Sequence, residues 1–181
     1  MSDAQQYTRT AIGLHWVIAL LIFAAFGLGW FMTDIPGFTM AKLKYYNWHK
    51  WLGVTVFLLA VIRLLWRFFH MPPPLADSIP KWQQLAASVV HWALYILIFA
   101  IPLSGYFYSL ASGFPVVYLG LVPLPVLIQP NADLAHTLKE VHELLNYSLV
   151  LLLLAHVGAA LKHHVIDKDG TLARMLPFLK K

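Results

Sequence analysis

The sequence predicts an all-α integral membrane protein, a four-helix bundle with both termini in the cytoplasm. Of its 181 residues, 60% are hydrophobic and only 12% are charged, which is far more apolar than a soluble domain of this size requires. Continuous apolar runs cover approximately residues 12–32, 48–68, 88–110 and 139–164. Each run is near or above the ~20 residues that a helix needs to cross the hydrocarbon. Barrel strands alternate in polarity and these runs do not, so we expect four helices in a single membrane domain, residues 1–181.

The three connections between the apolar runs are predicted to be loops because they carry helix-breaking residues. Pro36 and Gly37 follow the first run, and three consecutive prolines at 72–74 follow the second. The third connection is longer and carries four prolines, namely Pro115, Pro123, Pro125 and Pro130. The last helix is expected to begin near Asn131 or Asp133, since either residue can cap its N-terminus.

Lysine and arginine residues predict the orientation. Nine lie on the side of the two termini: Arg9, Arg63, Arg67, Lys81, Lys162, Lys168, Arg174, Lys180 and Lys181. Four lie on the opposite side: Lys42, Lys44, Lys50 and Lys139. Cytoplasmic flanks of membrane helices are enriched in these residues, so both termini are predicted to be cytoplasmic. The same pattern explains the net charge of +5 by contact with a lipid membrane and gives no reason to expect nucleic acid as a partner.

Histidine is the residue type that indicates a cofactor. The chain has nine histidines and no cysteine, which excludes disulfides, iron–sulfur clusters, thiolate zinc sites and covalently attached c-type haem. A histidine inside a membrane span must face the bundle interior and find a partner there. His142 and His156 are 14 residues apart, so they lie within roughly 40° of one helix face and about 21 Å apart along the axis. One histidine is therefore expected near each membrane face.

Other predicted helices supply histidines at the same two depths. His49 begins the second helix at the level of His142, and His15 begins the first helix at the level of His156. Two facing imidazoles are the axial ligands that a b-type haem takes in a helical bundle, so two b-type haems are predicted. His91 begins the third helix at the inner level as well. Helix geometry alone does not decide between His15 and His91 as the partner of His156.

Two further residues repeat the 14-residue spacing. Arg63 lies 14 residues beyond His49, on the same face at the inner level, where a guanidinium can bind haem propionates. The alternative is a cation whose side chain extends to the lipid interface. Gly29 lies 14 residues beyond His15, at the outer level, where a missing side chain would let a porphyrin approach the backbone.

His163 is a candidate for proton exchange at the inner side. It follows His156 by seven residues, so it returns to the same face within roughly 20°, just beyond the inner haem. Because the unperturbed pKa of histidine is about 6.5, such a group can exchange protons with a quinone. The alternative is a histidine that merely ends the helix at the interface. His70 and His136 are interpreted as loop or helix-edge residues.

Five segments resemble the prokaryotic cytochrome b561 family. They are residues 7–16, 47–54, 89–105, 141–164 and 167–177. The family consists of small di-haem, quinone-linked proteins of the bacterial inner membrane. It is related to the cytochrome b subunits of membrane hydrogenases and formate dehydrogenases.

The resemblance implies that His15 pairs with His156 at the inner haem, and that His49 pairs with His142 at the outer haem. It also implies a function, because one branch of the family acts as a superoxide oxidase. In that branch, periplasmic superoxide gives an electron to the outer haem and ubiquinone is reduced near the inner haem. His163 corresponds to a family histidine near the quinone.

Lys42, Lys44 and Lys50 cluster beside the predicted outer haem. Such a patch can attract a small anion such as superoxide, an effect that salt weakens. Two other functions remain open at this stage. One is a relay subunit that passes electrons between quinol and a separate periplasmic redox partner. The other is a non-redox path for zinc, copper or protons, which would lack the absorption bands of haem.

Overall fold

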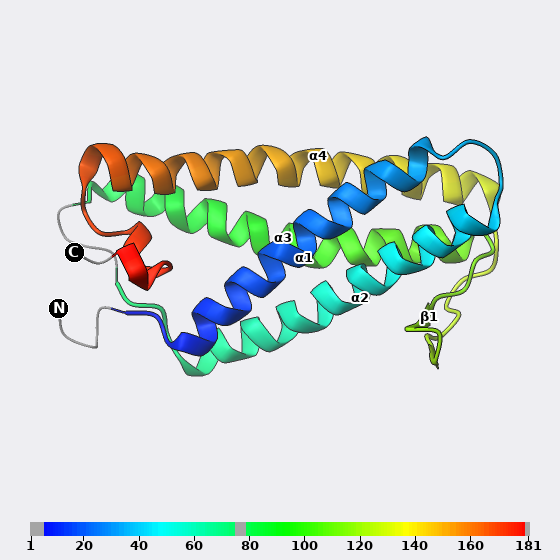
Figure 1. Ribbon diagram of the computed structural model, residues 1–181, viewed down its shortest axis with the longest axis horizontal. Helices are drawn as coiled ribbons and strands as arrows, with labels where there is room; N and C mark the ends of the chain where they lie inside the picture. Colours follow the sequence, from blue (N-terminus) through cyan, green and yellow to red (C-terminus); the bar gives the residue numbers. More distant parts are fainter. Residues whose placement is uncertain (1–5, 75–78, 180–181) are drawn as a thin grey trace.

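Four long helices dominate the computed structural model, which describes residues 6–74 and 79–179 (Figure 1). They are α1 (Arg9–Asp34), α2 (Met40–Phe69), α3 (Lys81–Ala111) and α4 (Ala132–Lys162). All four are long and apolar enough to cross a membrane, which confirms the prediction of an all-α chain with four candidate spans. After α4 the chain continues as a π-helical turn (His163–Asp167) and two 3-10 turns (Leu172–Arg174 and Pro177–Leu179).

Polar turns extend the helices beyond the apolar runs. α2 begins eight residues before its apolar run and α4 seven residues before. Hydropathy finds only the part of a helix that suits hydrocarbon, whereas side-chain caps decide where the helix begins. Thr39 caps α2 by accepting from the Lys42 amide, and Asn131 caps α4 by accepting from the Leu134 amide. Of the two predicted caps for the last helix, Asn131 is therefore correct.

The third connection contains a small hairpin that hydropathy did not predict. Its strands β1 (Val117–Tyr118) and β2 (Val122–Pro123) pair antiparallel. Two side chains of α2 attach it to the bundle: Trp51 Nε1 donates to the Val117 carbonyl at 2.7 Å, and Thr55 hydrogen-bonds the Tyr118 hydroxyl at 2.9 Å. The hairpin therefore packs beside α2 near one end of the bundle (Figure 1).

The helices pack as two pairs. α1 lies along α2, α3 lies along α4, and the two pairs meet where α2 packs on α3. Within the described residues, α4 makes at most slight backbone contact with α1 and α2. The backbone of α4 therefore stands apart from the first pair, and a space remains between them. The histidines of interest project into this space.

The two ends of the bundle differ. α1 begins at the same end at which α4 terminates, and the hairpin lies at the other end (Figure 1). We call these the inner end and the outer end, following the predicted orientation. The seven described cations predicted on the side of the termini lie toward the inner end; Lys180 and Lys181 are outside the described residues. The compartment that each end faces remains a prediction.

A small apolar cluster lies between the two ends. Leu94, Leu97 and Leu149 are buried against one another at the α3–α4 contact. Leu149 is seven residues from His142 and seven from His156, so it lies halfway between the two histidine levels. The outer surface is also apolar, with Leu20 66% and Phe23 61% exposed among many similar residues, as expected where lipid is the solvent.

The C-terminal segment folds back over the inner end. Trp16 Nε1 on α1 donates to the Met175 carbonyl at 2.9 Å, and Arg174 donates to the Pro74 carbonyl at 2.7 Å. Trp66 on α2 also donates to the Thr8 hydroxyl at 2.9 Å. These three bonds join the tail, both helices of the first pair and the second connection.

The predicted orientation can be tested by cysteine labelling, because the chain has no native cysteine. Leu121→Cys in the hairpin and Phe178→Cys in the tail replace residues that are 81% and 78% exposed. We expect a membrane-impermeant maleimide to label Leu121→Cys in intact spheroplasts, and Phe178→Cys only after permeabilisation. The reverse pattern would place the termini in the periplasm.

Candidate functional site

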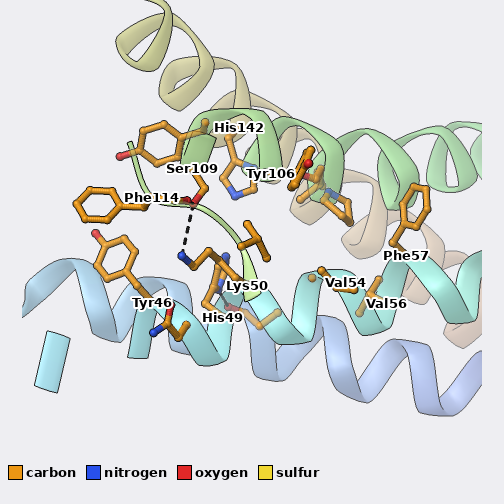
Figure 2. A pocket seen from close by; sticks show the side chains of 18 of the residues that line it. Tyr46, His49, Lys50, Val54, Val56, Phe57, Tyr106, Ser109, Phe114 and His142 are labelled. Atoms are coloured by element: carbon orange, nitrogen blue, oxygen red, sulfur yellow. Dashed lines mark hydrogen bonds between the residues drawn. The ribbon is translucent and has the colours of Figure 1, made fainter. Parts of the chain in front are cut away.

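His49 of α2 and His142 of α4 face each other at the outer end (Figure 2). Their ring centres are 6.3 Å apart and their planes are inclined by 82°. A metal held at about 2 Å from each imidazole nitrogen, with about 1 Å more from each nitrogen to its ring centre, requires a separation of about 6 Å. The spacing therefore suits one metal ion between two axial imidazoles.

Backbone carbonyls orient both rings. His49 Nδ1 is 2.9 Å from the Ala25 carbonyl oxygen, and His142 Nδ1 is 3.1 Å from the Ile101 carbonyl oxygen. His142 Nδ1 also lies 3.0 Å from the Ser104 hydroxyl. A carbonyl can only accept, so each Nδ1 must carry the hydrogen and each Nε2 keeps its lone pair. This is the tautomer in which Nε2 can ligate a metal.

A glycine makes room for each ring. A Cβ added at Gly29 would lie 3.1 Å from His49 Cε1, and one added at Gly105 would lie 2.9 Å from His142 Cε1. Each glycine is four residues after the carbonyl that its histidine contacts, Ala25 or Ile101. The sequence analysis attributed Gly29 to the approach of a porphyrin, whereas in the structure the His49 ring contacts it. Gly105 was not singled out, and its spacing from Ile101 becomes informative only once the contact is known.

A cavity of about 840 Å³ opens beside these histidines and is lined by both of them. Its wall comes from all four helices and the third connection and is mostly apolar. Ligand sites of about 300 to 1,000 Å³ with apolar walls and a few polar groups accommodate organic cofactors. Among the described residues, the lining includes Lys42 and Lys50 but no aspartate or glutamate.

Three histidines converge at the inner end. The ring centres of His15 and His156 are 6.3 Å apart, and those of His91 and His156 are 5.3 Å apart. The first distance equals that of the outer pair, whereas the second is shorter than the separation of about 6 Å that a metal between two imidazoles requires. The structure thus brings both predicted candidates to His156, and the spacing favours His15.

Arg63 lies beside the inner cluster. Its Nη1 donates to the Ala11 carbonyl at 3.2 Å, one helical turn before His15, and its Nε donates to the Tyr95 hydroxyl at 3.1 Å. Its positive charge acts on both His15 and His156. The guanidinium is therefore directed into the bundle and not toward the lipid interface.

His163 is held by two carboxylates beyond α4. Its Nδ1 lies 2.6 Å from Asp169 and 3.1 Å from Asp167, and Lys162 forms an ion pair with Asp167 at 2.7 Å. Burial raises the pKa of Asp169, but hydrogen bonds from Thr171 and from His163 outweigh it and keep that pKa below its usual range. The carboxylate is therefore ionised at neutral pH and fixes the hydrogen on Nδ1. Neither aspartate was expected beside His163 from the sequence, because only the π-helical turn and the reversal after it bring them there.

The family description "Prokaryotic cytochrome b561" matches residues 6–178. The chain belongs to this family. Cytochrome b561 homolog 2 of Escherichia coli (strain K12) is 36% identical over 172 residues, covering 95% of this chain and 92% of that protein. Cytochrome b561 homolog 1 of the same strain is 35% identical over 176 residues, covering 95% and 97%. A protein of Yersinia pestis named "Probable superoxide oxidase CybB" is 33% identical over 177 residues, covering 96% and 97%.

Membership makes this cytochrome b561 relative a membrane electron carrier and implies haem b as its cofactor. The residues at the outer end fit that group. Two imidazoles with free Nε2 lone pairs suit axial ligation of iron, and the apolar cavity suits a porphyrin. The two lysines of the cavity wall suit its anionic propionates.

Gly105→Ala should displace the His142 ring, since the new Cβ would lie 2.9 Å from Cε1. We expect a fall in haem b per chain and an altered low-spin spectrum, measured by pyridine haemochrome assay and electron paramagnetic resonance. Gly158→Ala is the matched control, because its Cβ meets nothing within 4 Å. Unchanged haem content and spectrum in Gly105→Ala would contradict the role of this contact.

Proposed function

We propose that this cytochrome b561 relative moves electrons across the bacterial inner membrane through two b-type haems. His49 and His142 ligate the outer haem, and His15 and His156 ligate the inner one. The observation that carries the proposal is the repeated ring separation of 6.3 Å in both pairs. Both pairs draw one ligand from α4, so this helix sets the distance between the haems.

Bound haem b supplies reversible one-electron redox chemistry. The protein supplies the ligands, their orientation and an apolar medium. Leu94, Leu97 and Leu149 are packed between the two histidine levels. They keep water and ions out of the middle of the membrane, so that electrons cross while protons do not.

The proposed reaction is the oxidation of periplasmic superoxide coupled to the reduction of ubiquinone. Two superoxide anions each lose one electron and become O2, while ubiquinone gains two electrons and two protons and becomes ubiquinol. The Yersinia pestis relative, whose name includes superoxide oxidase, supports this reaction at 33% identity. Lys42, Lys44 and Lys50 at the outer end supply the positive field that draws in a small anion.

His163 is the proposed proton donor to ubiquinone at the inner end. Asp169 accepts from its Nδ1, so a proton taken up on Nε2 produces an imidazolium that the two carboxylates stabilise. Arg63 is the proposed partner of an inner haem propionate, because its guanidinium lies one helical turn from His15. Both roles are consistent with their position at the end where α4 terminates.

Pulse radiolysis of the purified, oxidised protein tests the reaction. We expect superoxide to reduce haem far faster than it dismutates, and the rate to fall as ionic strength rises because the lysine field is screened. Lys44→Glu, which reverses an exposed charge at the outer end, should lower the rate further at low salt. If superoxide does not reduce the haem, the relay function is favoured. A stoichiometric periplasmic redox partner that purifies with the protein would support that function.

The ligand pairs are tested by haem counting. His142→Ala and His156→Ala should each lower haem from about two to about one per chain, because each removes one ligand of one iron. The two variants should retain different redox midpoints, which identifies the outer and the inner haem. His91→Ala is the matched control at the inner end and should retain both haems. Loss of a haem in His91→Ala with retention in His15→Ala would reverse the inner assignment.

Asp169→Asn should slow ubiquinone reduction by about tenfold, a typical effect of losing a carboxylate that orients a histidine. Reduction of haem by superoxide should be unchanged, because that step occurs at the outer end. Because the pKa of Asp169 is lowered, its stabilising interaction with His163 is present at neutral pH and is lost only in acid, as the pH falls through that lowered pKa. Stopped-flow measurement of the two half-reactions separates these effects, and equal slowing of both would contradict the assignment.

A further inference from the structure

The outer cavity has an unbalanced positive charge. Among the described residues that line it, Lys42 and Lys50 are the only side chains with a fixed charge, and neither aspartate nor glutamate is present. A cation in a mostly apolar wall is costly unless an anion or several hydrogen-bond acceptors compensate it. The cavity therefore favours an occupant that carries negative charge.

The two lysines differ in how well the protein itself compensates them. Lys42 Nζ donates to the Ile35 carbonyl at 2.6 Å, so a strong acceptor is already in place. Lys50 Nζ has only the Ser109 hydroxyl within the described residues, at 3.5 Å, which is at the long limit for a hydrogen bond. Ser109 donates its own hydrogen to the Phe114 carbonyl at 2.5 Å. Its oxygen is thus oriented to accept from Lys50, but it satisfies at most one of the three ammonium hydrogens.

Lys50 is positioned to act on whatever His49 binds. The two residues are adjacent on α2 and line the same cavity. Figure 2 shows the Lys50 ammonium directed toward Ser109, to one side of the His49 and His142 rings. A ligand held at the two imidazoles would share this cavity with the Lys50 ammonium. The propionates of a porphyrin would be the carboxylates available to it.

We propose that Lys50 binds a propionate of the outer haem, and that Ser109 is the positioning residue that holds the ammonium in place. The proposal rests on the assignment of the outer haem to His49 and His142. A charge-assisted hydrogen bond from Lys50 would hold the propionate. The uncompensated part of the lysine charge also stabilises the reduced iron, so Lys50 raises the midpoint potential of the outer haem relative to the inner one.

This role differs from attracting superoxide. Lys44 is on the same helix, is exposed and lies over the Trp48 ring at 4.9 Å, so it contributes only to the long-range field. Removing either charge lowers the rate of association with an anion. Lys50 should change an equilibrium property of the haem and Lys44 should not, because Lys50 lines the cavity and Lys44 does not.

The experiment is a spectroscopic redox titration of the full-length, haem-loaded protein with Lys50→Met, and with Lys44→Met as the matched control. We expect the outer haem of Lys50→Met to lose about tenfold in its equilibrium constant for reduction, equivalent to about 59 mV for a one-electron couple. The inner midpoint should stay unchanged, and Lys44→Met should match the wild type at both. Redox-difference infrared spectra should also show a shifted propionate carboxylate band in Lys50→Met alone.

Lys50→Arg and Ser109→Ala keep the proposal testable if Lys50→Met binds too little haem. Lys50→Arg should restore most of the midpoint, because it restores the cation, and Ser109→Ala should give a smaller downward shift. An unchanged outer midpoint in Lys50→Met would overturn the proposal. If that variant binds too little haem, an unchanged outer midpoint and an unshifted carboxylate band in Ser109→Ala would overturn it instead. Failure of the proposed haem assignment would be a separate result. The single variant His142→Ala, with Lys50 intact, would then retain the outer haem.

Discussion

An imidazole inside hydrocarbon needs a hydrogen-bond partner for each ring nitrogen, and the outer histidine pair depends on this requirement. Each Nδ1 contacts a backbone carbonyl of the helix paired with its own: His49 on α2 contacts Ala25 of α1, and His142 on α4 contacts Ile101 of α3. An imidazole can reach such a carbonyl only if the residue one turn further along that helix has no side chain to block the ring. Gly29 and Gly105 meet this condition. With Nδ1 hydrogen-bonded to the protein, the Nε2 lone pair is available for the proposed ligation of iron.

The arrangement of the helices follows from the same pairs. α4 packs closely on α3 and hardly touches α1 or α2, because the imidazoles of His49 and His142, and the cavity beside them, occupy that space. A conventional leucine-filled bundle would close this gap with side chains. Here the tight core is confined to a short apolar cluster around Leu149, which separates the two histidine levels and leaves room for a cofactor.

Charge is distributed according to what each end must do. Among the described residues, the wall of the outer cavity carries cations and no carboxylate, and the resulting positive field suits propionates and a small anionic reductant. The inner end adds carboxylates, and Asp169 contacts His163, the residue proposed to donate a proton to ubiquinone. The tail, fastened by Trp16 to Met175, brings this acidic partner into place. Electron entry and proton uptake are thereby proposed for opposite ends of one bundle.

The sequence by itself determined the four helices and the two depths at which histidines lie, because hydropathy and a 3.6-residue period report position along a helix and around its axis. Helix geometry could not decide which helices face one another, so only the family resemblance distinguished His15 from His91 as the partner of His156, and the ring separations then favoured the same residue. Every residue has a carbonyl, so the acceptors at Ala25 and Ile101 left no trace in the residue pattern. Those contacts, and with them the use of Gly105, were decided only by the tertiary structure.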